Sequence, residues 1–176
     1  PGPTLEHASL ALTIPVICRI TGKADRFDLA EISGQSVLSD KSAMPLFQML
    51  ARAGLAIIAV ERGDTQKCLE HHATLSSNAG TMLVIGGMCC DRLLGLLSQT
   101  MGDLTQAAAH FEEALAFCRK AGYRPELAWT CCDYADTLLQ RNGEGERAKA
   151  MSLLEESLSL SSELCMRPLM ERVLSR

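Results

Sequence analysis

Two histidines have a spacing that could serve chemistry. His71 and His110 stand 39 residues apart, and the same offset relates several other residues of their two segments. Two imidazoles brought to one face of a protein could bind a transition metal such as zinc. Neither histidine has a second metal-binding side chain four residues away, and the repeat pattern described below turns both toward the outer surface. We therefore expect no metal site and no cofactor.

Adjacent pairs of one residue type are the other candidates for catalysis. Glu112-Glu113 and Glu155-Glu156 are paired carboxylates, but at helical spacing they are expected on the solvated edge of a helix. Cys89-Cys90 and Cys131-Cys132 could be redox-active, although Arg92 is the one obvious thiolate activator nearby. The sequence contains no phosphate-binding P-loop, no nucleophile elbow and no zinc-protease motif. It thus predicts a protein that is not an enzyme.

Composition excludes several classes of protein. The chain has 176 residues, a net charge of −4 and 47% hydrophobic residues, which is typical of a folded globular chain. It has no basic block, so we expect no direct binding of nucleic acid. It has no run of 18 uncharged apolar residues, so we expect no membrane span. None of the eight cysteines forms a Cys-x-x-Cys and no signal peptide opens the chain, which indicates a reduced, cytoplasmic protein.

Small and bulky residues recur along the chain with a regular period. The clearest copy consists of Leu94-Gly95, Gly102-Asp103, Ala107, Phe111 and Ala114. A weaker copy lies 39 residues upstream, at Leu55-Ala56, Gly63-Asp64, Cys68, His72 and Leu75. A third lies downstream, at Tyr134-Ala135, Ala150, Leu154 and Ser157. This order is typical of the tetratricopeptide repeat, a helix–turn–helix unit whose stacked copies share one core and leave an elongated groove.

The repeats predict an all-α fold, a tetratricopeptide-like α-solenoid of about four antiparallel helical hairpins. We expect one repeat domain over residues 5–176, with hairpins at about 5–38, 46–76, 81–120 and 125–164 and a terminal stub at 167–176. Pro15 should kink or split the first helix, and Asp64 and Asp103 should cap the helices that follow them. The run Met82 to Ile85 is the one segment that could suggest a strand. Residues 1–4 resemble a linker or an artificial remnant, and the chain looks like a fragment of a longer protein.

Steric logic assigns roles to the repeated positions. Gly95, Ala107 and Ala114 are expected where helices cross closely, because a large side chain there would push the helix axes apart. Phe111 is expected to fill the space between one hairpin and the next, so Phe111→Ala should cost about 3–5 kcal/mol of stability. In the preceding repeat His72 takes the place of this aromatic, and we expect it to be a partly buried structural histidine.

The same register predicts a concave binding face on the inner helices. A protein, a peptide or a small effector could bind in such a groove, and Trp129, the single tryptophan, falls where recognition residues tend to be. The alternative is that the apolar members simply pack against a neighbouring helix of the same solenoid. The predicted face consists of Leu50, Ala53, Ile57, Val60, Cys89, Arg92, Leu96, Gln99, Trp129, Cys132, Asp136 and Leu139.

Several segments of the chain resemble the tetratricopeptide regions of large bacterial signalling ATPases. They are residues 102–122, 124–130 with 133–135, 153–158 and 163–174, and the resemblance extends over 46–174. In that family the repeat region follows an ATPase module, and it often precedes a LuxR-type output domain, as in activators of the maltose-operon type, or accompanies a nucleotide cyclase. The resemblance implies a regulatory sensor or interaction region that contacts the flanking domains of the full-length chain.

Two hypotheses about function follow. The first is a non-catalytic protein- or effector-binding repeat domain of a bacterial transcriptional or signalling regulator. The second is a structural spacer or self-association module of a larger ATPase or cyclase regulator, in which exposed end faces would produce a homodimer. The two are distinguished by a saturable ligand in the first case and by concentration-dependent association without one in the second.

Overall fold

The computed structural model describes residues 5–24, 26–83 and 87–176. Residues 1–4, expected to be a linker, lie outside the described part, as do Val84 and Ile85 of the run that could suggest a strand. The helices are α1 (Leu5–Thr21), α2 (Phe27–Ser39), α3 (Pro45–Arg62), α4 (Thr65–Leu75), α5 (Cys90–Thr100), α6 (Leu104–Ala121), α7 (Arg124–Arg141), α8 (Glu146–Glu163) and α9 (Arg167–Leu174). A short 3-10 turn, Ser76–Asn78, follows α4.

The expected all-α class is confirmed, with one small addition. Between α4 and α5 the chain forms a hairpin of two-residue strands, β1 (Met82–Leu83) and β2 (Met88–Cys89), which pair antiparallel. The first helix of the third hairpin, which was expected from about residue 81, therefore begins only at Cys90. Gly87 is the physical reason that the structure offers, because its φ of +61° is left-handed and cannot continue a right-handed helix.

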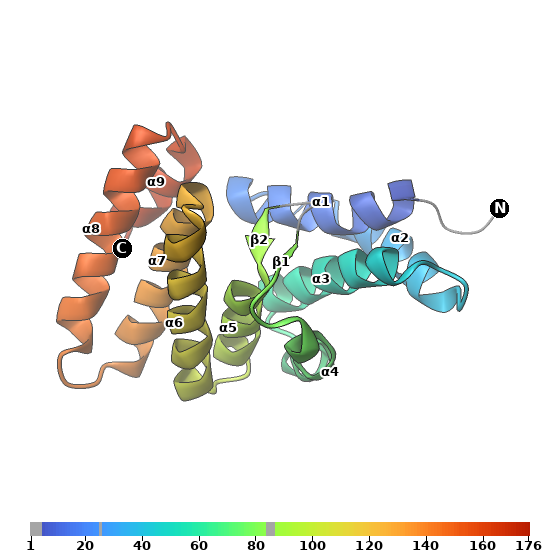
Figure 1. Ribbon diagram of the computed structural model, residues 1–176, viewed down its shortest axis with the longest axis horizontal. Helices are drawn as coiled ribbons and strands as arrows, with labels where there is room; N and C mark the ends of the chain where they lie inside the picture. The colour runs from blue at the N-terminus through green and yellow to red at the C-terminus, as the bar shows by residue number, and fades with distance from the viewer. Residues whose placement is uncertain (1–4, 25, 84–86) are drawn as a thin grey trace.

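Successive helices along the chain pack against one another. In Figure 1, α1 and α3 run across the view, whereas α6 and α8 stand upright. The strand hairpin lies between these two groups, and α4 lies below α3. Helix α1 packs on α2 and α3, and it also touches α9 at the other end of the sequence. Elements from both ends of the chain therefore meet beside the inner helices α5 and α7.

Two large apolar cores lie on the two sides of α5, and a smaller buried cluster joins α1, α2 and α3 through Cys18, Phe27, Ala30 and Ile58. The N-terminal core joins buried side chains of α1 to α5, including Leu12, Leu50 and Leu94. The C-terminal core joins α5 to α9 and contains Phe111, whose ring stacks on Tyr134 with centroids 5.6 Å apart. Helix α5 contributes Leu93, Leu94 and Leu97 to the first core and Leu96 to the second, so it forms the boundary between them.

Close helix crossings occur at glycines in both cores. A Cβ added at Gly95 would lie 2.9 Å from the Phe111 ring, and Phe111, Ala107 and Ala114 are fully buried, as their repeat positions predicted. In the N-terminal core the approach is tighter, because a Cβ at Gly54 would lie 1.8 Å from the backbone oxygen of Ala11. Helices α1 and α3 are therefore in contact through their backbones.

Local signals at the helix ends gave mixed results. Asp64 and Asp103 cap α4 and α6 as predicted, each accepting a hydrogen bond from the backbone N–H three residues on, at 3.0 and 2.9 Å. Of the two outcomes predicted for Pro15, a kink or a split of the first helix, the split is wrong, because α1 is continuous from Leu5 to Thr21. Pro15 is itself buried, and the packing of α1 on its neighbours outweighs the one backbone hydrogen bond that proline removes.

Candidate functional site

A group of charged side chains is buried where four helices meet. Glu126 and Asp133 lie on one face of α7, because they are seven residues, or two helical turns, apart. They meet Arg92 of α5, Arg19 of α1 and Arg172 of α9. These five residues are called the charge cluster below. The side chains of Glu126 and Asp133 are only 2% and 1% exposed, so they depend on protein partners.

Asp133 is the centre of the charge cluster. Its Oδ2 accepts a hydrogen bond from Arg92 Nη1 at 2.8 Å. Its Oδ1 accepts from Arg19 Nη2 at 2.8 Å and from Arg172 Nη2 at 3.3 Å. One carboxylate thus joins α1, α5 and α9 to α7, and these contacts span 114, 41 and 39 residues of sequence.

The second carboxylate fixes Arg92 and the strand hairpin. Glu126 Oε1 accepts from Arg92 Nε at 2.7 Å and from the backbone N–H of Cys89 in β2 at 2.7 Å. Arg92 therefore bridges Glu126 and Asp133 along the face of α7. Its guanidinium also lies 5.9 Å from the ring centre of Trp129, and that of Arg172 lies 5.8 Å from the same ring.

The pKa values of the two carboxyl groups are shifted in opposite directions by the balance of burial and charge pairing. Burial alone raises the pKa of Asp133, but the guanidiniums of Arg19, Arg92 and Arg172 together lower this pKa to about 2. For Glu126, burial raises the pKa and the attraction of Arg92 only partly offsets it, so the pKa stays above its ordinary value. Asp133 is consequently the firmly ionised anchor of the cluster.

The charge cluster has more hydrogen-bond donors than acceptors. Three arginines face two fully buried carboxylates, and the Nε atoms of Arg19 and Arg172 are buried without a hydrogen-bond partner. Glu61 and Asp136 pair with Arg19 and Arg172 from the edge of the cluster, where their side chains are 28% and 21% exposed. Unpaired buried donors are rare in proteins, and each of these two N–H groups lacks an acceptor that water or a ligand would supply.

A cavity of about 230 Å³ adjoins this cluster. It lies between α1, the strand hairpin, the start of α7 and the residues before α9, and Trp129 forms part of its wall. Gly87 is required beside it, because a Cβ there would lie 2.5 Å from the Tyr123 hydroxyl. The cavity is lined by Val16, Arg19, Ile20, Gly87, Met88, Arg92, Tyr123, Pro125, Glu126, Trp129 and Met166.

Only two members of the predicted concave face reach this cavity, namely Arg92 and Trp129. Leu50, Ala53 and Ile57 are at most 1% exposed and belong to the N-terminal core, where α1 packs on α3. Cys89, Leu96 and Cys132 are buried in the C-terminal core. The remaining four, Val60, Gln99, Asp136 and Leu139, are half-buried. The apolar members of the predicted face therefore pack against neighbouring helices of the same chain.

Sequence reasoning missed most of the charge cluster. Arg19, Glu126, Asp133 and Arg172 were not candidates. Glu126 and Asp133 accept hydrogen bonds from Arg92, and Arg19 and Arg172 donate hydrogen bonds to Asp133. One signal was available on α7, where two acidic residues two turns apart flank the tryptophan on a helix otherwise rich in small and apolar residues. No comparable signal marked the arginines, which come from distant helices.

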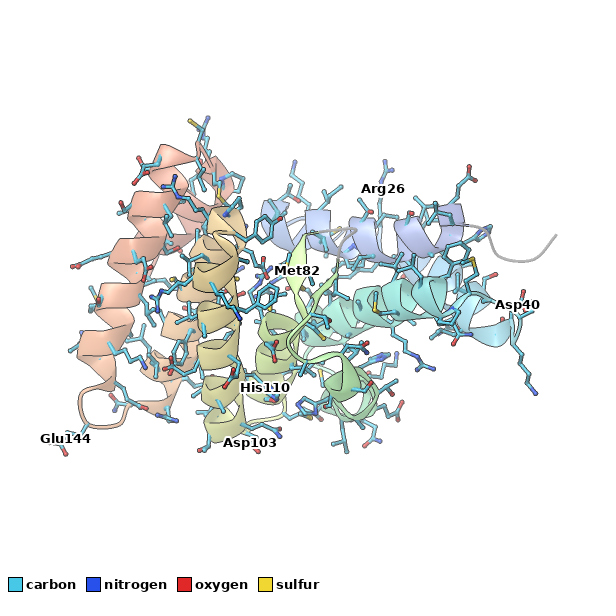
Figure 2. The ribbon with its side chains drawn as sticks, viewed as in Figure 1. Arg26, Asp40, Met82, Asp103, His110 and Glu144 are labelled. Atoms are coloured by element: carbon cyan, nitrogen blue, oxygen red, sulfur yellow. The ribbon has the colours of Figure 1, made fainter. Side chains whose placement is uncertain are left out.

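The two histidines of the sequence pattern do not meet each other. Instead His72 of α4 faces His110 of α6, with 3.2 Å between the two Nε2 atoms. His71 lines a separate cavity between α2, α3 and α4, together with Glu31 and Lys67. Figure 2 shows His110 on the side of α6 that is turned toward α4. Among the residues that the structure describes, no three His, Cys, Asp or Glu side chains converge as a set of metal ligands.

The cysteine and glutamate pairs have structural roles. The members of both adjacent cysteine pairs are buried and are not joined by disulfides. Burial raises the pKa of Cys90 and of Cys132 to about 12, which disfavours the reactive thiolate at these two residues. The pKa of Cys89 is lowered instead, chiefly by a hydrogen bond with Cys118. Glu112 and Glu113 are exposed, as is Glu155, and Glu156 is half-buried, so these carboxylates lie at the solvated edges of α6 and α8 as predicted.

Comparison with protein-family models, with curated proteins and with solved structures finds no match to this chain. Within its described residues, no helix combines the length and the apolar character needed to cross a bilayer. The assignment of a function therefore depends on the charge cluster and its cavity.

Proposed function

We propose that this chain is a non-catalytic effector-binding domain of a bacterial transcriptional or signalling regulator in the cytoplasm. In this proposal α1–α2, α3–α4, α5–α6 and α7–α8 are the four hairpins of a tetratricopeptide-like solenoid, and α9 covers its C-terminal end. The cavity beside Trp129 is the single observation that carries the proposal. The regulator assignment is supported by the resemblance of residues 46–174 to the repeat regions of large signalling ATPases.

The size of the cavity favours a small molecule over a peptide. Its volume of about 230 Å³ is below the range of roughly 300–1,000 Å³ that is typical of pockets for drug-sized ligands. A bound helix or extended peptide would need a long open groove, and most residues of the predicted concave face are buried between helices. Of the two kinds of ligand that the sequence suggested, the small effector fits this geometry better.

The lining of the cavity favours an organic anion with an apolar body. Val16, Met88 and Met166 offer apolar contacts, and Tyr123 and Trp129 add aromatic ones. Arg92 uses Nε and Nη1 for the carboxylates of α7, and we assign its Nη2 to an acidic group of the ligand. The surplus of buried donors in the charge cluster supports this choice.

Titration monitored by Trp129 fluorescence tests the proposal. Small carboxylic acids with aromatic or branched bodies should produce a saturable change, because Trp129 is the single tryptophan and lines the cavity. The methyl ester or primary amide of each acid is the matched control and should bind at least roughly tenfold more weakly, since it lacks the charge that Arg92 recognises. Equal binding of acid and ester would contradict the assignment of an anion.

Two substitutions on α1 test whether the ligand binds in the cavity or elsewhere on this helix. Ile20→Phe adds bulk at a residue that lines the cavity and should abolish the fluorescence change. Ile17→Phe adds the same bulk three residues away, at a side chain that is 51% exposed and does not line the cavity, and should leave binding intact. If both variants bind as the parent does, the cavity is not the binding site.

A second candidate function is a self-association or spacer module. It is favoured by the exposed apolar side chains of the first two helices, among them Ile17, Leu29 and Ile32. In that case a second copy of the chain would cover these residues. Sedimentation that depends on protein concentration, with no saturable change at Trp129, would support this alternative over the effector-binding domain.

A further inference from the structure

A pair of imidazoles faces each other across the contact between α4 and α6, away from the cavity. The Nε2 atoms of His72 and His110 are 3.2 Å apart, and the two rings are inclined at 62° with centroids 5.3 Å apart. A tetrahedral ion with bonds of about 2.0–2.1 Å to nitrogen holds two of its nitrogen ligands about 3.3 Å apart. The pair therefore has the separation that a shared metal ion requires.

The outer nitrogen of each ring faces an oxygen, as in a metal-binding histidine, and that of His72 is within hydrogen-bonding distance of it. Such histidines usually direct their second ring nitrogen at an oxygen, which fixes the tautomer and the ring orientation. His72 Nδ1 lies 3.4 Å from the hydroxyl of Ser76, and His110 Nδ1 lies 4.0 Å from Oδ1 of Asp91. Asp91 is itself held in place by the backbone N–H of Gly80, which donates to Oδ2 at 2.6 Å.

We propose that His72 and His110 bind one divalent transition-metal ion through their Nε2 atoms. Both side chains are half-buried, so water can complete the coordination of the ion. Imidazole ligands suit zinc, copper and nickel, whereas magnesium and calcium prefer oxygen. Because only two protein ligands converge in the described residues, we expect a site of moderate affinity rather than a closed structural one.

The protonation of the pair is compatible with this role. Burial lowers the pKa of both histidines, and the neighbouring His110 lowers that of His72 further. Both rings are consequently neutral at pH 7, where a neutral imidazole has a lone pair for a metal. The earlier expectation of no metal site concerned His71 and His110, and it did not consider the pairing of His72 with His110.

Two neutral imidazoles can also meet at this distance through one hydrogen bond, and the experiment must separate the two cases. The full chain should first be freed of metal with a chelator and carry Cys165→Ser, since Cys165 is the one exposed thiol. Titration with zinc chloride should then bind one ion per chain and raise the melting temperature by roughly 5 °C near saturation. Magnesium chloride at the same concentration should do neither.

Variants identify the ligands. His72→Gln and His110→Gln should each weaken zinc binding roughly tenfold or more, while circular dichroism confirms that the helices are retained. His71→Gln is the matched control and should bind zinc as the parent does, because His71 lines a different cavity.

Three results would overturn the proposal: no zinc bound by the parent chain, equal loss in the His71→Gln control, or zinc binding that persists when His72 and His110 are both replaced. The first of these would leave the pair as a simple hydrogen bond. None of these results depends on whether the cavity beside Trp129 binds an effector.

Discussion

The two cores of this protein are built on different principles. The N-terminal core is apolar and close-packed, and its helices approach so tightly that Gly54 of α3 touches the backbone of α1. The C-terminal core adjoins a buried charge cluster centred on Asp133. Burying charges costs free energy that an apolar core of the same volume would not cost. The buried charges, whose burial costs more free energy, lie beside the cavity, where a charged ligand could contact them.

The surfaces of the two regions also differ, because the N-terminal region exposes most of the large apolar side chains that contact solvent. Nine of the eleven large apolar side chains that are exposed in the described residues lie before residue 70, and only Met151 and Leu174 lie in the C-terminal region. The N-terminal region, which has the apolar core, thus exposes more large apolar side chains to solvent than the C-terminal region, which contains the buried charges. This contrast is why the self-association proposal concerns the first two helices, whereas the cavity of the effector-binding proposal lies between α1 and the C-terminal region.

Removing the carboxylate of Asp133 should destabilise the C-terminal region more than any other change predicted below. Asp133→Asn leaves the guanidiniums of three arginines without their shared counter-charge, and we expect a loss of about 3–5 kcal/mol in the free energy of unfolding, measured with urea. Asp136→Asn is the control, since this half-buried residue pairs with Arg176 at the edge and should cost about 1 kcal/mol or less. Similar losses in both variants would mean that burial gives Asp133 no special role.

In the N-terminal region a single methyl group should be enough to disturb the packing. Gly54→Ala places a Cβ 1.8 Å from the backbone oxygen of Ala11, so α1 and α3 must move apart at a cost of about 1–3 kcal/mol. The measurement is again urea denaturation.

Gly34→Ala provides the matched comparison for this substitution. The three nearest atoms to its Cβ would all belong to the Leu55 side chain, at 3.1–3.3 Å, so a shift of that side chain by a few tenths of an ångström is enough. The helix preference of alanine should then make Gly34→Ala neutral or slightly stabilising. A loss as large as that of Gly54→Ala would show that the backbone contact is not the cause.

The contact of α4 with α6 joins the two regions, and it should respond to pH. His72 is faced by His110 and Asp103, and His110 by Asp91 and Glu113. Because burial lowers the pKa of both histidines, the unfolded chain binds more protons below its ordinary histidine pKa of about 6.5. Their contribution to stability is therefore complete above that pH and is lost as the pH falls through and below it.

Melting temperatures between pH 8 and pH 5.5, in the presence of a chelator, test this effect. The parent chain should lose more stability over this range than a chain with His72→Gln and His110→Gln. Identical pH profiles would show that the pair does not titrate differently in the folded and unfolded states. His71, whose pKa burial also lowers, is present in both chains and cancels in the comparison.

The smallest effect on stability is expected at the exposed apolar surface. Ile32→Gln changes a side chain that is 69% exposed and should alter the free energy of unfolding by no more than about 0.5 kcal/mol. If a second copy covers α2, the same change should weaken association in sedimentation experiments. Leu174→Gln, at a side chain 71% exposed in the C-terminal region, is the control and should leave association unchanged.

Local features of the sequence predicted the helices well. Asp64 and Asp103 mark helix starts through hydrogen bonds to residues three positions on, and Gly63 and Gly122 end helices in the left-handed conformation. The position of Phe111 between helices also followed from the spacing of its neighbours. All of these depend on contacts between residues that are close in sequence or related by the repeat.

The candidate site could not be predicted in the same way. Arg19 and Asp133 are separated by 114 residues, and no periodic pattern states which distant charges will meet. The register of the inner helices did identify Trp129 and Arg92, but it also included Leu50 and Ala53, because it could not foresee that α1 packs on that face of α3. The distribution of charge along α7 was the only local trace of the site.

The carboxylate of Asp133 also has a mechanical consequence. It receives hydrogen bonds from Arg19 in the first helix and from Arg172 in the last, so the polypeptide is closed into a ring by ionic contacts. These contacts hold the first and the last helix to the same carboxylate, so tension applied between Arg19 and Arg172 would act on them directly.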